Sequence, residues 1–301
     1  MHSHPSTHTL SGIILMCGFC LFGPAIDMFA KLAADTLPLA QITAARFALQ
    51  LIFLLPLTLI MKKPLLPASS DILFHLLRGA LILMATASFF MAVSYLPLAD
   101  ALAIFFIEPF FLTFLAVFFL NERIGWRRVT ACIIGFLGAL LVIQPQYDMV
   151  GWPALLPIIT ALCFAFFLLL TRKMSQNMDA ISLQLHTTIA ATLILVVCFA
   201  IMRHQNHSGF NLVMPDSYQL FLLMGVGLSA TIAHLFLTAA FARAPVGILA
   251  PLQYLEIVTA TFLGIVIFAD IPNLTTISGV LIIISAGLYV IYREQKLQKT
   301  A

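Results

Sequence analysis

Two glutamates stand in the middle of apolar stretches, where charged residues are rare. Glu108 and Glu256 each follow a proline by 11 residues, Pro97 and Pro245 respectively, inside runs long enough to cross a membrane. A charged side chain in the hydrocarbon core costs on the order of 2.5–3.5 kcal/mol, so such acids normally face a cavity or a partner group. The chemistry predicted is binding of a cationic group, or exchange of a proton. A hydrogen-bonded acid that only holds helices together is the alternative.

Polar and aromatic residues surround both glutamates. Gln253 precedes Glu256 by three residues and so shares its helical face, and Pro251 frees a backbone carbonyl nearby. Pro109 is expected to interrupt the helix beside Glu108 in the same way. Aromatic rings at these positions offer a surface for a flat chemical group. The predicted substrate-binding residues are Glu108, Glu256, Gln253, Tyr254 and Phe105.

Three charged residues form a second candidate cluster. Asp27 and Lys31 are four residues apart with the acid first, the favourable order for a helical ion pair. Arg46 lies in the following apolar stretch, and the short connection brings it close. These residues either neutralise one another as a structural network or act as a gate by separating and pairing again.

Two histidines also fall within apolar stretches. His186 and His234 lie in the predicted spans 180–202 and 217–241, toward the same side of the membrane. Histidine titrates near neutral pH, so a proton relay is one interpretation. Hydrogen bonding between helices is the other.

The composition defines the elements that must position these residues. Hydrophobic residues make up 62% of the 301 positions and charged residues only 9%, against about 45–50% and about 25% in soluble domains. This excludes a soluble globular enzyme, and a net charge of +3 leaves no basic face for nucleic acid. The fold class predicted is an all-α integral membrane protein, surrounded by the lipid bilayer. Hydropathy places ten spans at residues 10–31, 38–60, 72–95, 99–120, 126–144, 152–171, 180–202, 217–241, 247–269 and 274–292.

The basic residues predict the orientation of these spans. If the N-terminus is cytoplasmic, twelve lysines and arginines lie on that side, while only Lys31 and Arg203 lie on the other. We therefore predict a multi-pass protein of the inner membrane with residues 1–9 and the basic residues 293–301 as cytoplasmic tails. The twelve are Lys62, Lys63, Arg78, Arg123, Arg127, Arg128, Arg172, Lys173, Arg243, Arg293, Lys296 and Lys299.

The chain also repeats itself after 148 residues, which predicts two units at 10–144 and 152–292. Five spans in each unit make the second copy enter the membrane from the opposite side, as in many carriers. Both glutamates then lie nine residues into their helices from opposite faces, roughly 13 Å deep in a core of about 30 Å. The equivalent pairs include Pro97 with Pro245, Glu108 with Glu256, and Glu122 with Asp270.

Motifs for other chemistries are missing from the sequence. It contains no Gly-Lys dipeptide and hence no Walker A loop, and it has no HExxH or comparable metal-ligand spacing. We therefore expect no catalytic residues, no metal and no cofactor.

Several motifs resemble the EamA-type domain of the drug/metabolite transporter superfamily. They are the stretch Pro97–Ile104 followed by Glu108-Pro109, the stretch 135–143, and their counterparts at 250–256 and 279–294. The resemblance implies a ten-helix bundle of two inverted five-helix repeats around a central cavity, which carries small organic solutes by alternating access. Residues 253–256 and 287–294 are similar to a branch with S-adenosylmethionine and riboflavin carriers. Where the family often has glycine before the acid that follows spans 4 and 9, this chain has Asn121 and Ala269.

The function predicted is secondary active transport of a small organic metabolite, with no enzymatic activity. The midplane acids favour a cationic or zwitterionic solute such as S-adenosylmethionine or an amino acid, or a riboflavin-like solute, with a proton as a possible coupling ion. Monomer and homodimer both fit such a bundle. An integral-membrane enzyme, for which the short loops supply few titratable groups, and a channel are the alternatives.

Overall fold

The computed structural model describes residues 5–96, 98–122, 125–144, 151–204, 212–269 and 271–300. Pro97, Asp270 and the outermost residues of the predicted tails, 1–4 and 301, lie outside these ranges. Within them the chain is helical and has no strand. Ten helical segments in the described part are long and apolar enough to cross a membrane, which confirms the predicted spans. Helices dominate because the bilayer offers no water to backbone N–H and C=O groups, which a helix satisfies internally.

The first five spans are built from six helices and begin at the N-terminus. In chain order these elements are α1 (Pro5–Ala34), α2 (Leu39–Ile60), the short η1 (Ser69–Asp71), α3 (Ile72–Tyr95), α4 (Leu98–Phe105), α5 (Glu108–Leu120) and α6 (Trp126–Ile143).

The last five spans follow the same plan. Their elements are η3 (Trp152–Ala154), α7 (Leu155–Met174), α8 (Ala180–His204), α9 (Ser217–Arg243), α10 (Val246–Leu249), η5 (Ala250–Leu252), α11 (Leu255–Phe268) and α12 (Leu274–Thr300).

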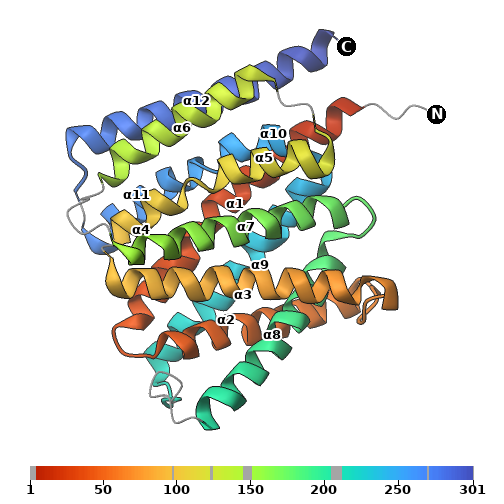
Figure 1. Cartoon of the computed structure of the whole chain (residues 1–301), viewed down its shortest axis with the longest axis vertical. Coiled ribbons are helices and arrows are strands. Elements are labelled where there is room, and N and C mark those ends of the chain that lie inside the picture. Colours follow the sequence, from red (N-terminus) through yellow and green to blue (C-terminus); the bar gives the residue numbers. More distant parts are fainter. Residues whose placement is uncertain are drawn as a thin grey trace.

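The two halves pack as inverted copies. Helix α1 packs against α9 as its equivalent α7 packs against α3, and α2 contacts α9 as α8 contacts α3. Likewise, the contact between α5 and α7 has its equivalent in the contact between α11 and α1. Equivalent helices pair directly at α2–α8 and at α6–α12, and the second pair forms one edge of the bundle (Figure 1). Such reciprocal contacts are expected when a two-fold axis in the membrane plane relates the halves.

One pair of equivalent residues meets on this axis. Phe106 and Tyr254 are 148 positions apart, and the Tyr254 hydroxyl donates a hydrogen bond of 3.1 Å to the Phe106 carbonyl. Their ring centroids are 6.0 Å apart. A residue can contact its own equivalent only near the axis, so this contact marks the centre of the molecule.

Spans 4 and 9 are both interrupted at this centre, as their prolines predict. Helix α4 ends at Phe105 and α5 begins at Glu108, while α10, η5 and α11 divide span 9. Pro109 and Pro251 lie at these interruptions and have no N–H to donate. Each glutamate consequently lies in the first turn of the second half-helix, where the helix dipole favours a negative charge.

The two interrupted spans also end alike. Asn121 and Ala269 follow α5 and α11 with φ angles of 53° and 56°, in the left-handed region. Glycine commonly closes a helix in this conformation because it has no Cβ, which gives a physical reason for the glycine common in the family. Asn tolerates the conformation better than Ala.

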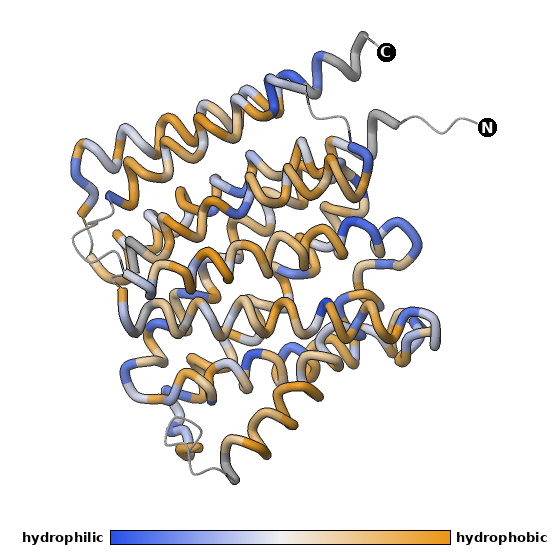
Figure 2. Tube along the Cα trace, viewed as in Figure 1, coloured by the Kyte–Doolittle hydropathy of each residue, from blue (hydrophilic) through white to orange (hydrophobic). Residues whose placement is uncertain are grey.

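Apolar residues follow the helices and polar residues gather at their ends (Figure 2). The first residue of α1 and the last residue of α12 lie toward the same side of the bundle, here called the terminal side; the opposite side is the far side (Figure 1). The predicted tails are largely helical, because α1 already begins at Pro5 and α12 continues to Thr300. The residues after Tyr292 are mostly strong helix formers, so α12 continues beyond the apolar segment that crosses the membrane.

Candidate substrate-binding site

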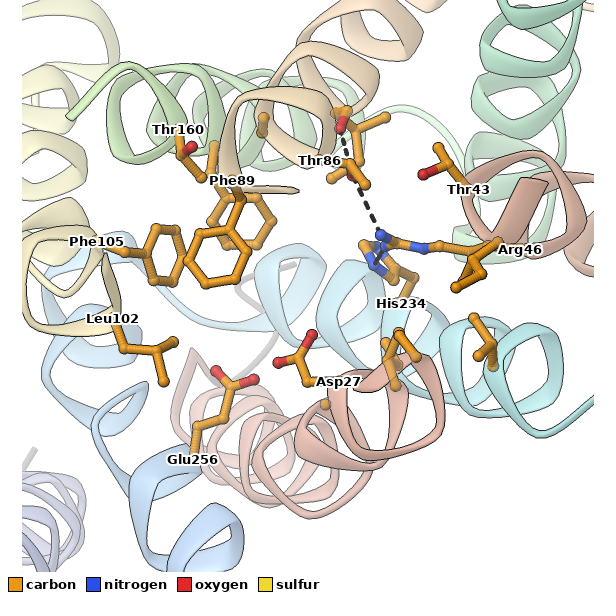
Figure 3. A pocket seen from close by; sticks show the side chains of 18 of the residues that line it. Asp27, Thr43, Arg46, Thr86, Phe89, Leu102, Phe105, Thr160, His234 and Glu256 are labelled. Carbon is orange, nitrogen blue, oxygen red and sulfur yellow. Dashed lines mark hydrogen bonds between the residues drawn. The ribbon is translucent and has the colours of Figure 1, made fainter. Parts of the chain in front are cut away.

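A cavity of about 130 Å³ lies between the helices of the two halves (Figure 3). Its walls come from α1, α2, α3, α4, α7, α9 and α11, and the lining is mainly apolar. The residues that α2 and α3 contribute lie in the parts of these helices nearer the far side. Asp27 in the wall is exposed, so the cavity reaches solvent on that side.

Two carboxyl groups form the acidic wall of the cavity. Asp27 from α1 and Glu256 from α11 point toward each other in Figure 3. Gly23, one turn before Asp27, makes room for the second acid, because a Cβ built there would lie 2.5 Å from Glu256 Oε1. The thiol of Cys20 donates to the Leu252 carbonyl near the interruption of span 9, at 3.4 Å. Helix α1 therefore helps to set the position of Glu256.

A guanidinium group lies across the cavity on α2. The Nη1 of Arg46 donates to Thr86 Oγ1 at 3.2 Å, and its Nη2 lies 2.8 Å from Nε2 of His234. Thr86 and His234 are themselves 148 residues apart, so the arginine bridges equivalent positions of the two halves. The predicted cluster is thus divided: Asp27 and Arg46 line the cavity, whereas the Lys31 ammonium lies 4.1 Å from the Phe268 ring centroid, outside the lining.

Aromatic rings complete the cavity at the start of span 4. Phe105, a predicted binding residue, packs against Phe89 and Phe164 with ring centroids 5.9 Å apart in both pairs. Sequence reasoning missed Phe89 and Phe164, and also the lining hydroxyl of Thr160, because phenylalanine and threonine are common in membrane helices. Thr86 was also missed, although the shift of 148 residues from His234 points to it.

Three predicted binding residues do not line this cavity. Glu108, Gln253 and Tyr254 are 2%, 3% and 0% exposed, in a sealed cluster where α5, α6 and η5 meet. Tyr254 is held against Gly135, where a built Cβ would lie 2.5 Å from its ring. Oε1 of Glu108 and Nε2 of Gln253 have no hydrogen-bond partner among the described residues. The interruptions turn these three side chains toward the two-fold axis and away from the cavity.

The two histidines lie in different environments. His234 lines the cavity, whereas Nε2 of His186 lies 3.1 Å from the Pro64 carbonyl, outside the lining. The His186 ring packs against His75, with centroids 4.9 Å apart. Helix α8 turns His186 toward α3, so the two histidines of the predicted relay do not line the same cavity.

An ion pair holds the two halves together on the terminal side. The Glu122 carboxylate accepts hydrogen bonds from the backbone N–H groups of Val246 and Gly247, at 3.2 and 3.3 Å, at the start of α10. It also lies 3.4 Å from Arg172 Nε, and Arg172 donates to the Phe241 carbonyl at 2.6 Å. This terminal-side latch joins the end of span 4 to spans 6, 8 and 9.

A buried arginine fills the bundle between the latch and the cavity. Arg78 on α3 is fully buried, and its guanidinium lies 4.5 Å from the centroid of the Phe167 ring. Arg78 was counted among the twelve basic residues of the cytoplasmic side, and its burial corrects that count, since an arginine inside the bundle carries no orientation signal. The Arg78 guanidinium donates hydrogen bonds to three other helices. The acceptors are the Thr171 hydroxyl on α7, the Thr187 hydroxyl and the Leu183 carbonyl on α8, and the Thr238 hydroxyl on α9.

An all-helical membrane bundle of two inverted halves, with interrupted helices at mid-depth and a cavity between them, defines the class of secondary carriers. The model of the EamA-like transporter family matches residues 10–144 and 151–293, and the chain belongs to this family.

Named relatives support this assignment. The chain is 30% identical to the S-adenosylmethionine uptake transporter of Rickettsia bellii over 272 residues, 90% of each chain. It is 29% identical to the riboflavin transporter of Rhizobium johnstonii over 75% of this chain and 72% of the relative. It is 25% identical to the pseudopaline exporter of Pseudomonas aeruginosa UCBPP-PA14 over 92% and 94%. A crystal structure with 15% identity has the same fold, with a TM-score of 0.78 over 99% of both chains.

Proposed function

We propose that this protein moves a small cationic or zwitterionic organic solute across the bacterial inner membrane by alternating access. The observation that carries the proposal is the pair of carboxyl groups, Asp27 and Glu256, that point toward each other in one wall of a mainly apolar cavity. Acids in this setting attract a positive group, because the mainly apolar walls offer them few other polar partners. Phe89, Phe105 and Phe164 add a surface for a flat ring system.

S-adenosylmethionine is the first candidate solute. It carries a sulfonium, an ammonium and an adenine ring, which suit two acids and an aromatic wall. Riboflavin has a flat ring system but no fixed positive charge, so it would leave the acidic wall unpaired.

The basic residues favour cytoplasmic termini, so the far side of the bundle would be the periplasmic side. The cavity then receives solute from outside, while the latch of Glu122 with Arg172 and α10 closes the cytoplasmic path. Rocking of one half against the other would break the latch and open that path.

A proton is the coupling ion that suits this site. When the solute leaves, Asp27 and Glu256 face each other without a cation between them. A proton bound to one of these carboxyl groups replaces the positive charge of the solute. The solute and the proton would therefore bind to the carboxyl group in turn.

Transport in proteoliposomes tests the proposal. Uptake and efflux of labelled S-adenosylmethionine, amino acids, polyamines and riboflavin are compared across an imposed pH gradient. We expect one class of cationic or zwitterionic solute to be carried and to raise the melting temperature of the purified protein. Transport should fall strongly in Glu256→Gln. Unchanged transport in both Glu256→Gln and its equivalent Glu108→Gln would exclude the midplane acids from solute binding.

A further inference from the structure

We propose that Arg46 forms a carboxylate-binding subsite within the cavity, so that the carried solute bears a carboxylate as well as a positive group, as an α-amino acid does. This inference rests on the proposed function, because it assigns the second charged group of the same solute.

The guanidinium of Arg46 has donors to spare. An arginine has five N–H donors, and in this protein Nη1 reaches Thr86 and Nη2 reaches His234. The Nε is buried and has no hydrogen-bond partner among the described residues. No carboxylate of the described part lies within 4.0 Å of this arginine. Burial of a cation is costly unless an anion in direct contact compensates it. Asp27 lies in the same cavity but makes no such contact, and a solute carboxylate would supply it.

The neighbours of Arg46 hold it in a defined orientation. Thr86 on α3 and His234 on α9 contact its two terminal nitrogens from different helices. Both neighbours are at least nine-tenths buried, at 8% and 4% exposure. A guanidinium held in this way presents its remaining N–H groups in a fixed plane, which matches the two oxygens of a carboxylate.

The charges of the cavity are separated in space. Asp27 and Glu256 occupy one wall, on α1 and α11, and Arg46 occupies the facing wall on α2 (Figure 3). An arginine that served only to neutralise Asp27 would approach it as an ion pair, and these two residues do not form one. One acidic and one basic wall around the same space fit a zwitterion, with its ammonium or sulfonium on the acids and its carboxylate on the arginine.

A structural role for Arg46 predicts a different behaviour. If the arginine only holds α2 against α3 and α9, its loss weakens the binding of every solute alike. If it binds a carboxylate, its loss removes the distinction between solutes with and without that group.

Solute pairs that differ only in the carboxylate provide the test. Suitable pairs are S-adenosylmethionine with its decarboxylated form, methionine with methioninamide, and arginine with agmatine. Affinities are measured by ligand-induced thermal shift on the purified full-length protein, and by competition against a labelled solute in proteoliposomes. We expect the wild type to prefer the member with the carboxylate by about 10- to 100-fold.

The variants separate the two roles. In Arg46→Gln the preference for the solute with the carboxylate should fall to within about twofold. In Arg46→Lys it should be partly kept, because lysine retains the positive charge but lacks the planar pair of N–H donors that matches a carboxylate. Thr86→Val, which removes one contact of the guanidinium, should reduce the preference less. Arg127→Gln, an exposed cation over Trp126, is the matched control and should keep the full preference. Melting curves without ligand show whether each variant is folded.

Two results would overturn the subsite and leave the cation site standing: equal binding of both members of the pairs by the wild type, or an equal loss for both members in Arg46→Gln. The wild-type comparison needs no variant, so it decides even if Arg46→Gln does not fold. If no member of any pair binds to the wild type, the proposed function fails and the subsite with it.

Discussion

Glu108 and Glu256 occupy equivalent positions in the two halves but have different surroundings. Glu256 lines the cavity beside Gly23 and faces Asp27. Glu108 is 2% exposed, and its Oε1 has no hydrogen-bond partner among the described residues. Two positions that match in sequence thus differ in access to solvent.

The difference indicates that the structure represents one state of an alternating cycle. If the halves exchange their conformations, the surroundings of the two glutamates exchange as well. Glu108 would then face a cavity that is open on the terminal side, and Glu256 would be sealed. The burial of the Glu108 carboxyl group has a physical reason in this account, because the same group meets the solute in the other state.

Removal of the charge at each glutamate gives the largest expected contrast. A cation bound to Glu256 forms a charge-assisted contact of about 1.5–3 kcal/mol, so Glu256→Gln should weaken solute binding from the far side by about 10- to 100-fold. Glu108→Gln should change it by less than about threefold. Ligand-induced thermal shifts of the two variants measure both effects. Equal losses in the two variants would remove the asymmetry on which the comparison rests.

Loss of the latch should expose the environment of Glu108. Glu122→Gln removes the charge that holds Arg172 and the first N–H groups of α10, which should shift the balance of states by about 1–2 kcal/mol. Cys132 is buried close to Glu108 and serves as a native reporter. In a variant without the other four cysteines, its labelling from the terminal side should accelerate by about five- to thirtyfold.

Arg127→Gln is the control for the latch experiment, since this arginine is exposed and packs over Trp126 instead of joining the halves. Unchanged labelling of Cys132 in Glu122→Gln would show that the ion pair does not hold the terminal side closed.

Substitution of Gly23, which lies beside Glu256, should have a smaller effect on solute binding than removal of the glutamate charge. A Cβ at this position would lie 2.5 Å from Glu256 Oε1, so Gly23→Ala should displace the carboxyl group at a cost of about 1 kcal/mol. Solute binding should weaken by about fivefold. Gly18→Ala on the same helix is the control, because its Cβ would meet Phe236 and no acid. Wild-type affinity in Gly23→Ala would mean that the carboxyl group is not held by α1.

The ends of the interrupted spans give the smallest expected effect. Ala269 adopts a left-handed conformation that costs an alanine about 1 kcal/mol. Ala269→Gly should therefore stabilise the protein by about 0.5–1 kcal/mol, with transport unchanged. Asn121→Gly, at the equivalent position, should stabilise it less because Asn tolerates this conformation. Thermal unfolding in detergent measures both, and a lower melting temperature in Ala269→Gly would contradict the account of these helix ends.

The fold could be predicted from the sequence further than the site could. Hydropathy located all ten spans, and Pro109 and Pro251 indicated where two of them are interrupted. The helices are apolar on every side, so no amphipathic pattern shows how each one is rotated. For this reason Tyr254 and Gln253 were expected in the cavity and lie behind it, and Arg78 was counted as a basic residue of the cytoplasmic side although it is buried.

The different roles of the two glutamates could not be predicted either. Their equal spacing from Pro97 and Pro245 indicates equal depth, and the repeat makes them interchangeable. If the two glutamates exchange their surroundings during the cycle, which of them faces solvent depends on the state of the carrier, and the equal spacing from the prolines carries no information about that state.

An experimental structure of the wild type with a bound solute would show which acids hold its positive group. The solute is the member of the panel that stabilises the protein most, and it is added at saturating concentration. We expect density for its positive group between Asp27 and Glu256, with Glu108 still sealed whenever the cavity is open to the far side. Density for that group at Glu108, with the cavity open to the far side and Glu256 unoccupied, would contradict this expectation.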